Sequence, residues 1–165
     1  MLAKIGVLAT DENALLKSAK DVLGTSKPLN KAEKIQILEW LDDRLPTFEV
    51  WKDLRIREIP EAKRAGSDAL NLYVQFATKY DDQLYRGLEE GTSPLLVIGG
   101  NSAQEMYWKT KIWAVRERPK EYVLKLLGIK SISDAKVKSP TEYAYYKQYI
   151  QWVRTLSTPG KVQRV

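Results

Sequence analysis

The chain of 165 residues contains no cysteine and no histidine. Without cysteine there is no disulfide to support the fold, and no thiolate for catalysis or zinc binding. Without histidine the chain lacks the commonest general base and the commonest metal ligand in proteins. Together these absences exclude most hydrolase triads, zinc sites and haem ligation, and we predict no cofactor and no metal.

Acidic residues are scarce in the second part of the chain. Residues 1–100 hold 14 Lys/Arg and 16 Asp/Glu, whereas residues 101–165 hold 13 and 5. Such a basic region could face nucleic acid, an anionic membrane or an acidic protein, although solvated helix faces explain it more simply. No run approaches the roughly 20 apolar residues that span a bilayer, so we expect no membrane span. No signal peptide is visible at Met1, and we expect either a cytosolic chain or one whose targeting segment has been removed.

What the sequence does contain is an internal repeat at an offset of 73 residues without a gap. Between residues 40 and 75, 11 of 36 positions are identical to those 73 residues later, where ordinary residue usage gives roughly two by chance. The shared residues are mostly apolar or aromatic, and they include the pairs Trp40/Trp113, Pro46/Pro119, Val50/Val123 and Tyr73/Tyr146. The pattern indicates two copies of one small unit in tandem.

Both copies show the capping residues and the residue spacing that are typical of helices. Asn30 with Glu33, and Ser102 with Glu105, form the pattern of a capping box before the helices that carry the two shared tryptophans. Pro46 and Pro119 each begin a short helix, and Gly128 ends the second of them. Long helices with aromatic stripes follow, the second one starting at Ser139-Pro140-Thr141-Glu142 with an N-cap serine. We predict an all-α fold.

These patterns divide the chain into four segments. A first unit with an additional N-terminal helix, which we place between Thr10 and Gly24, covers residues 1–91. Residues 92–101 form a connector whose apolar core, Leu95–Ile98, we expect to pack between the units, with an exposed docking site as the alternative. The second unit covers residues 102–156, and residues 157–165 form a flexible tail.

The order of these features resembles the WY domain, the helical module of secreted RXLR effectors from oomycete plant pathogens such as Phytophthora. The shared features are a helical Trp, a Pro six residues on, a short apolar helix ending in Leu-x-Ile, and a Tyr on a later helix. The second copy is the closer match, with Trp113 followed by RPKEYVLKLLGI and SPTEYAYYKQYIQW. The first copy departs from the pattern at Arg55, which replaces Gly128, and it lacks the Ser-Pro start. The RXLR motif itself is absent.

The resemblance implies two tandem WY-like helical bundles in which Trp and Tyr form the core and carry no chemistry. Strict identity makes Tyr73 and Tyr146 the motif tyrosines, while the family's spacing also allows Tyr149, whose counterpart is Phe76. The expected core residues are Trp40, Tyr73, Phe76, Trp113, Tyr146 and Tyr149. The resemblance further implies a virulence protein that is secreted by the pathogen, enters the cytoplasm or nucleus of the plant cell, binds a host protein and suppresses immunity.

The remaining motifs do not point to catalysis. Trp51-Lys52-Asp53-Leu54 fits a loose autophagy-binding pattern, but its helical position assigns Trp51 to the core. The paired acids Asp42-Asp43, Asp81-Asp82 and Glu89-Glu90 are interpreted as solvated faces, because neighbouring residues on a helix point apart. No nucleophile and base can be assembled, so we predict that the chain is not an enzyme.

Binding is therefore the predicted mode of action, through residues that differ between the copies. The candidate partner surface consists of the basic positions Lys109, Lys111, Arg116, Arg118 and Lys120. The alternative is a basic helical protein that binds nucleic acid, such as a suppressor of RNA silencing, although the spacing of the aromatic residues assigns them to the core rather than to base stacking. A structural repeat protein without a role in infection also remains open, and so does a homodimer.

Overall fold

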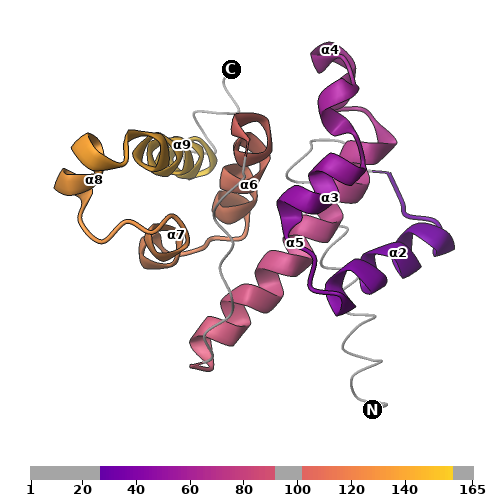
Figure 1. The fold of residues 1–165 in the computed structure, drawn as a ribbon, viewed down its shortest axis with the longest axis horizontal. Coiled ribbons are helices and arrows are strands. Elements are labelled where there is room, and N and C mark those ends of the chain that lie inside the picture. Colours follow the sequence, from indigo (N-terminus) through magenta and orange to yellow (C-terminus); the bar gives the residue numbers. More distant parts are fainter. Residues whose placement is uncertain (1–26, 92–101, 158–165) are drawn as a thin grey trace. The chain divides into compact units, whose positions relative to one another are not determined.

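The computed structural model describes residues 27–91 and 102–157, and every regular element in these ranges is a helix (Figure 1). This confirms the predicted all-α fold. The chain divides into two compact units, Met1–Ser93 and Pro94–Val165, which are described separately. The predicted N-terminal helix, the Leu95–Ile98 connector and the tail beyond residue 157 lie outside the described residues.

The first unit packs its short helices on one long helix. Its elements are α2 (Lys31–Asp42), α3 (Thr47–Asp53), the 3-10 helix η1 (Ile56–Glu58), α4 (Glu61–Arg64) and α5 (Asp68–Glu89). Helices α2 and α3 contact α5, and every residue of α5 from Leu70 to Lys79 is buried. The apolar side chains of Ile37, Val50 and Ile56 complete this core. Burial of such side chains supplies the main favourable free energy of folding.

Local sequence sets the starts of these helices. The Asn30 side chain accepts the Glu33 N–H at 2.8 Å while the Glu33 carboxylate accepts the Asn30 N–H at 2.9 Å. This confirms the predicted capping box, which satisfies two backbone donors that the first turn would leave open. The Ser67 hydroxyl accepts the Leu70 N–H at 3.1 Å and caps α5 in the same manner.

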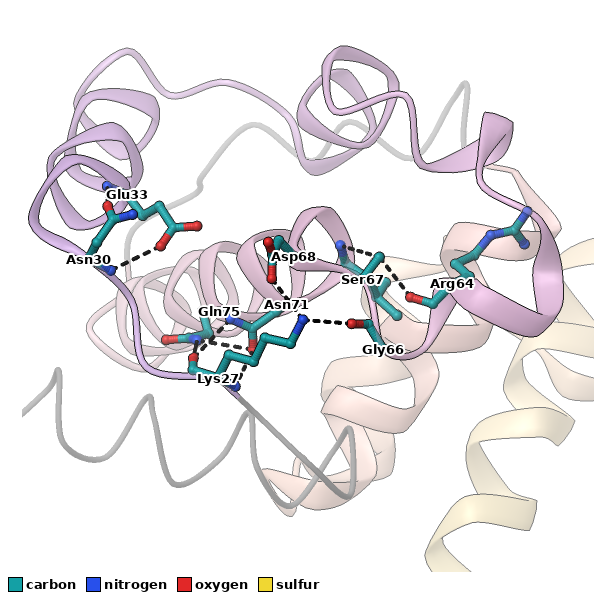
Figure 2. A network of polar contacts seen from close by, with 10 residues as sticks. Lys27, Asn30, Glu33, Arg64, Gly66, Ser67, Asp68, Asn71 and Gln75 are labelled. Carbon is teal, nitrogen blue, oxygen red and sulfur yellow. Dashed lines mark hydrogen bonds and ion pairs between the residues drawn. The ribbon is translucent and has the colours of Figure 1, made fainter.

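Polar side chains of α5 hold the chain that leads into the first unit (Figure 2). Asn71 Oδ1 accepts the Lys27 N–H at 3.2 Å, and Asn71 Nδ2 donates to the Lys27 carbonyl at 2.9 Å. Gln75 Nε2 donates to the same carbonyl at 3.3 Å. The Lys27 ammonium group reaches the Gly66 carbonyl at 2.9 Å and the Asp68 carboxylate at 2.8 Å. Asn71 thus pairs with Lys27 as a neighbouring strand would, which fixes the backbone there.

The second unit has the same order of long and short helices. It consists of α6 (Ala103–Val115), α7 (Lys120–Leu126), α8 (Ile132–Lys138) and α9 (Pro140–Leu156), with α6 and α8 packed on α9. Gly128 ends α7 with a φ of 71°, as predicted. Ser139 is the N-cap residue of α9 and Pro140 is its first residue, as predicted, but the Ser139 side chain makes no cap hydrogen bond. Its backbone already closes α8 (φ −137°, ψ 59°), outside the extended conformation usual for an N-cap.

The loops after α2 and α6 have the same backbone conformation at the offset of the sequence repeat. Arg44 and Glu117 both have a φ of 56°, and adding 73 to the bounds of α3, 47 and 53, gives the bounds of α7, 120 and 126. In each loop the N–H five residues after the shared tryptophan donates to that tryptophan's carbonyl, at 3.1 Å from Leu45 and 2.9 Å from Arg118. These bonds define Schellman motifs. A proline directly after the motif then starts the next short helix, which explains the Trp–Pro spacing in physical terms.

Candidate interaction surface

The predicted core aromatics of the first unit lie on α2 and α5. Trp40 is half-buried, and its ring centroid lies 5.4 Å from that of Phe76 at an interplanar angle of 73°. Phe76 and Tyr73 are both fully buried. Tyr73 meets a different ring, that of Trp51, with the centroids 5.0 Å apart. The aromatic that faces Trp40 is therefore the one at position 76, and edge-to-face contacts of this kind stabilise a core beyond simple burial.

The predicted core aromatics of the second unit are buried as well. Trp113, Tyr146 and Tyr149 are 2%, 8% and 3% exposed. The Tyr149 hydroxyl donates a hydrogen bond of 2.5 Å to the Arg118 carbonyl in the loop before α7. Burial raises the pKa of both Tyr146 and Tyr149 above the usual tyrosine value. None of these side chains presents a reactive group to solvent, so their placement is that of packing residues.

The five basic positions proposed as a partner surface do not form one surface. Arg118 is only 8% exposed, with its guanidinium carbon 5.9 Å from the centroid of the Tyr122 ring, so its assignment to an exposed surface is wrong. Lys120 is exposed, and Lys109, Lys111 and Arg116 are half-buried. Lys109 and Lys111 are two residues apart on α6, which turns their side chains about 200° from each other. The periodicity of a helix thus separates residues that the sequence places side by side.

The structure instead gathers Lys111 with three aromatic rings. The Lys111 Nζ lies 4.8 Å from the centroid of the Trp152 ring on α9 and 5.7 Å from that of Trp108 on α6. Tyr107 stands edge-on to both indoles, with ring centroids 5.0 Å from Trp108 and 5.4 Å from Trp152. We call Tyr107, Trp108, Lys111 and Trp152 the aromatic–lysine cluster. An ammonium group at these distances over indole faces makes a cation–π interaction.

The aromatic–lysine cluster is incompletely covered. Tyr107 is 39% exposed, and Trp108, Lys111 and Trp152 are half-buried. Partial burial lowers the pKa of Lys111 below the usual lysine value, because it penalises the charged form. In residues 27–91 and 102–157 no carboxylate lies within ion-pair distance of Lys111. Assignment of every aromatic stripe to the core therefore missed this cluster, whose spacing within α6 is visible in the sequence but whose Trp152 comes from another helix.

A second group consists of one ring, that of Tyr143 on α9, and two lysines, one from α8 and one from α9. The Lys136 and Lys147 ammonium groups lie 5.8 Å and 5.5 Å from the centroid of the Tyr143 ring. Val137, between two lysines on α8, is 81% exposed. Because Tyr143 and Trp152 are nine residues apart on α9, they face nearly opposite directions. The two groups are consequently separate surface features of the second unit.

The acidic pairs do not assemble a reactive site in the described ranges. Asp42-Asp43 and Glu89-Glu90 are exposed as predicted, but Asp81 is only 5% exposed, which corrects its assignment to a solvated face. Asp81 follows the buried stretch of α5 from Leu70 to Lys79, so the packing of this helix, and not its charge, fixes its exposure. Within residues 27–91 and 102–157 no three acidic side chains gather as a metal site would require. None of the helices there combines the length and the apolar character of a membrane crossing.

Comparison with known proteins gives one informative match. No family model and no solved structure matches the chain. The chain is 27% identical over 130 residues to a protein of Phytophthora infestans (strain T30-4) described as a secreted RxLR effector protein. The match covers 76% of this chain and 53% of that protein, so the chain spans about half the length of the relative. This similarity supports a relationship between the chain and secreted RxLR effectors.

Proposed function

We propose that the chain is a pathogen effector that acts inside the plant cell, in the cytoplasm or nucleus, by binding a host protein and thereby suppressing immunity. The observation that carries this proposal is the similarity to the secreted RxLR effector of Phytophthora infestans over 76% of the chain. Its action is contact rather than chemistry. The buried aromatics hold the fold, and the surface makes the contacts.

We further propose that the two units are WY-like bundles related by duplication. The equal offset of α3 and α7, and the two loops with a φ of 56° at Arg44 and Glu117, support this relation. The pairing of Trp40 with Phe76 supports a core of the WY kind in the first unit. A duplicated scaffold keeps the residues that determine the backbone and allows the others to vary. The variable surface is then where a specific host partner binds.

Expression in leaf cells of a host plant tests the proposal. An elicitor peptide is applied, and the burst of reactive oxygen is measured with and without the chain. We expect the intact chain to reduce the burst, and Trp113→Ala, which removes a core ring, to abolish the reduction. Lys125→Ala is the matched control, because Lys125 is exposed on α7. An undiminished burst in cells that accumulate the intact chain would contradict the proposal.

A binding assay separates this function from the nucleic-acid alternative. The purified chain is titrated with single-stranded and double-stranded RNA at two salt concentrations. We expect no tight binding to either. Tight binding that weakens steeply as salt rises would favour a nucleic-acid-binding protein, since release of counterions gives that dependence.

A further inference from the structure

We infer that the aromatic–lysine cluster of the second unit is the centre of a docking surface for an acidic protein segment, one that carries carboxylates beside apolar side chains. The inference rests on the proposed binding function and names the class of partner. It requires an anion to pair with Lys111 and an apolar group to cover the rings around it. Both requirements follow from the geometry of the cluster.

The rings supply the apolar part of the surface. The Tyr107 ring stands edge-to-face to the Trp108 and Trp152 rings, with centroids 5.0 Å and 5.4 Å away, and Tyr107 is 39% exposed. Rings locked in this way lose little conformational entropy when a partner covers them. Tryptophan and tyrosine are also the residues that most often dominate the binding energy of protein interfaces. The cluster therefore has the composition and the rigidity of an interface centre.

Lys111 supplies the charge. Its ammonium group lies over the faces of Trp152 and Trp108, and no carboxylate in the described ranges is within ion-pair distance. A partner carboxylate at this position would form a charge-assisted hydrogen bond in a partly dehydrated environment. Such bonds are stronger than those between fully solvated surface groups, for which the median contribution is small. Lys111 is therefore able to pair with an anionic side chain of a partner.

The charge of the whole unit favours the same partner. Residues 102–157 carry 11 Lys/Arg and 5 Asp/Glu, a difference of 11 − 5 = 6 positive charges. None of the lysines Lys111, Lys120, Lys125, Lys136 and Lys147 has a carboxylate within ion-pair distance in the described part of the chain. An acidic segment is attracted to such a surface and a basic one is repelled, which raises the rate of association and the specificity.

The first unit indicates that the repeated fold does not require this cluster. At the offset of 73, Tyr107, Trp108, Lys111 and Trp152 correspond to Lys34, Ile35, Leu38 and Lys79. Ile35 and Leu38 are 46% and 44% exposed. The corresponding helix positions thus carry exposed aliphatic side chains in the first unit, and a tryptophan with a half-buried lysine in the second. Residues that the scaffold leaves free to vary are those that binding can use.

The test measures binding of a defined acidic peptide at the two indoles. The probe is a peptide of about 12 residues, long enough to cover a small interface, in which Glu alternates with Leu around one central Phe. Its control replaces every Glu by Gln. Nuclear magnetic resonance spectra of the full chain record the indole N–H signals, which Trp108→Phe and Trp152→Phe assign. We expect the Glu peptide to shift both signals, and the Gln peptide to bind at least about tenfold more weakly.

Two lysine variants locate the charge that matters. Lys111→Glu reverses it, while Lys111→Met removes it and keeps an unbranched apolar stem beside the rings. The matched control is Lys147→Glu, since Lys147 belongs to the same unit and also lies over a ring, that of Tyr143, at 5.5 Å. We expect about a tenfold or larger loss of affinity for both Lys111 variants and less than about threefold for the control. Circular dichroism establishes that each variant is folded.

Several outcomes would overturn the inference. Equal binding of the Glu and Gln peptides, or equal losses for Lys111→Glu and Lys147→Glu, would show that the anion does not pair at Lys111. Absence of any indole shift would place the binding surface elsewhere. Tighter binding of a single-stranded RNA of similar length at the same signals would identify nucleic acid as the ligand, and shifts that depend on the concentration of the chain alone would identify a second copy. Because the leaf assay uses the intact chain, continued suppression of the oxygen burst alongside any of these results rejects the cluster and retains the proposed function.

Discussion

The two units bury their shared tryptophans to different extents and hold their helices with different side chains. In the first unit Trp40 is half-buried and faces Phe76, and the polar side chains of Asn71 and Gln75 hold the chain at Lys27. In the second unit the corresponding tryptophan, Trp113, is 2% exposed. The loop conformation is therefore shared between the units, whereas the side-chain contacts that hold it are specific to each copy.

The ring at positions 76 and 149, on α5 and α9, is one example of this difference. Tyr149, the counterpart of Phe76, donates its hydroxyl hydrogen to the Arg118 carbonyl, and a phenylalanine cannot make such a bond. Gln75 is repeated as Gln148, but its partner changes: Gln75 donates to the Lys27 carbonyl, whereas Gln148 Oε1 accepts the Thr110 hydroxyl hydrogen at 3.2 Å. Identity in sequence therefore does not imply identity of contact.

Truncation of the two tryptophans should give the largest contrast between the units. Trp113→Ala is expected to destabilise the second unit by about 3–5 kcal/mol, because it leaves a cavity in a closed core. Trp40→Ala should cost less, about 2 kcal/mol, since part of that side chain already contacts water. Urea unfolding of each variant, followed by circular dichroism, measures both values. An equal or larger loss for Trp40→Ala would contradict the difference in burial.

Removal of the hydrogen bonds between Asn71 and Lys27 should affect the first unit alone. Asn71→Ala deletes both hydrogen bonds to Lys27 and leaves the backbone groups of that residue without these partners, at an expected cost of about 1–3 kcal/mol. Hydrogen exchange should show the Lys27 amide losing protection while the amides of α9 keep theirs. The counterpart of Asn71 is Ala144, so Ala144→Gly serves as a control for a change at the same position of the second unit. Retained protection at Lys27 would exclude a clamping role for Asn71.

Exchange of the ring at positions 76 and 149 tests how closely the loops correspond. Tyr149→Phe should cost about 1 kcal/mol, because the Arg118 carbonyl loses its donor. If the two loops correspond, Phe76→Tyr should change the stability of the first unit by less than about 1 kcal/mol, because the Leu45 carbonyl, the counterpart of the Arg118 carbonyl, would then accept the new hydroxyl hydrogen. Thermal unfolding compares the two variants. A large loss of stability for Phe76→Tyr would mean that the Leu45 carbonyl does not lie where the Arg118 carbonyl lies in the second unit.

Titration to alkaline pH should give the smallest contrast. Burial raises the pKa of Tyr145, Tyr146 and Tyr149 in the second unit, and of Tyr80 in the first. A raised pKa in the folded state means that stability is retained below the tyrosine pKa of the unfolded chain, near pH 10, and is lost as pH rises through the folded value. Absorbance of tyrosinate should therefore show late titration of these residues. Loss of the late phase in Tyr149→Phe would assign part of it, whereas an unchanged curve would contradict the assignment.

The order of the helices could be predicted from local sequence patterns. Capping residues, prolines and Gly128 act through bonds within a few residues, so the boundaries of α2, α3, α7 and α9 could be predicted closely. The burial of Trp51 also followed from its helical position. The short helix α8 was not predicted as a separate element, although Ser131 caps it, because no proline precedes it as Pro119 precedes α7.

Which side chains meet depends on how distant helices pack against one another. Trp152 joins Tyr107, Trp108 and Lys111 because α9 packs on α6, and no local pattern shows that contact. Arg118 and Asp81 look like surface residues in the sequence, yet packing encloses them, since neighbouring elements rather than charge fix their exposure. Hydrophobic spacing determines which face of a helix turns inward. The partner of each side chain on that face is set by the arrangement of helices far apart in the chain.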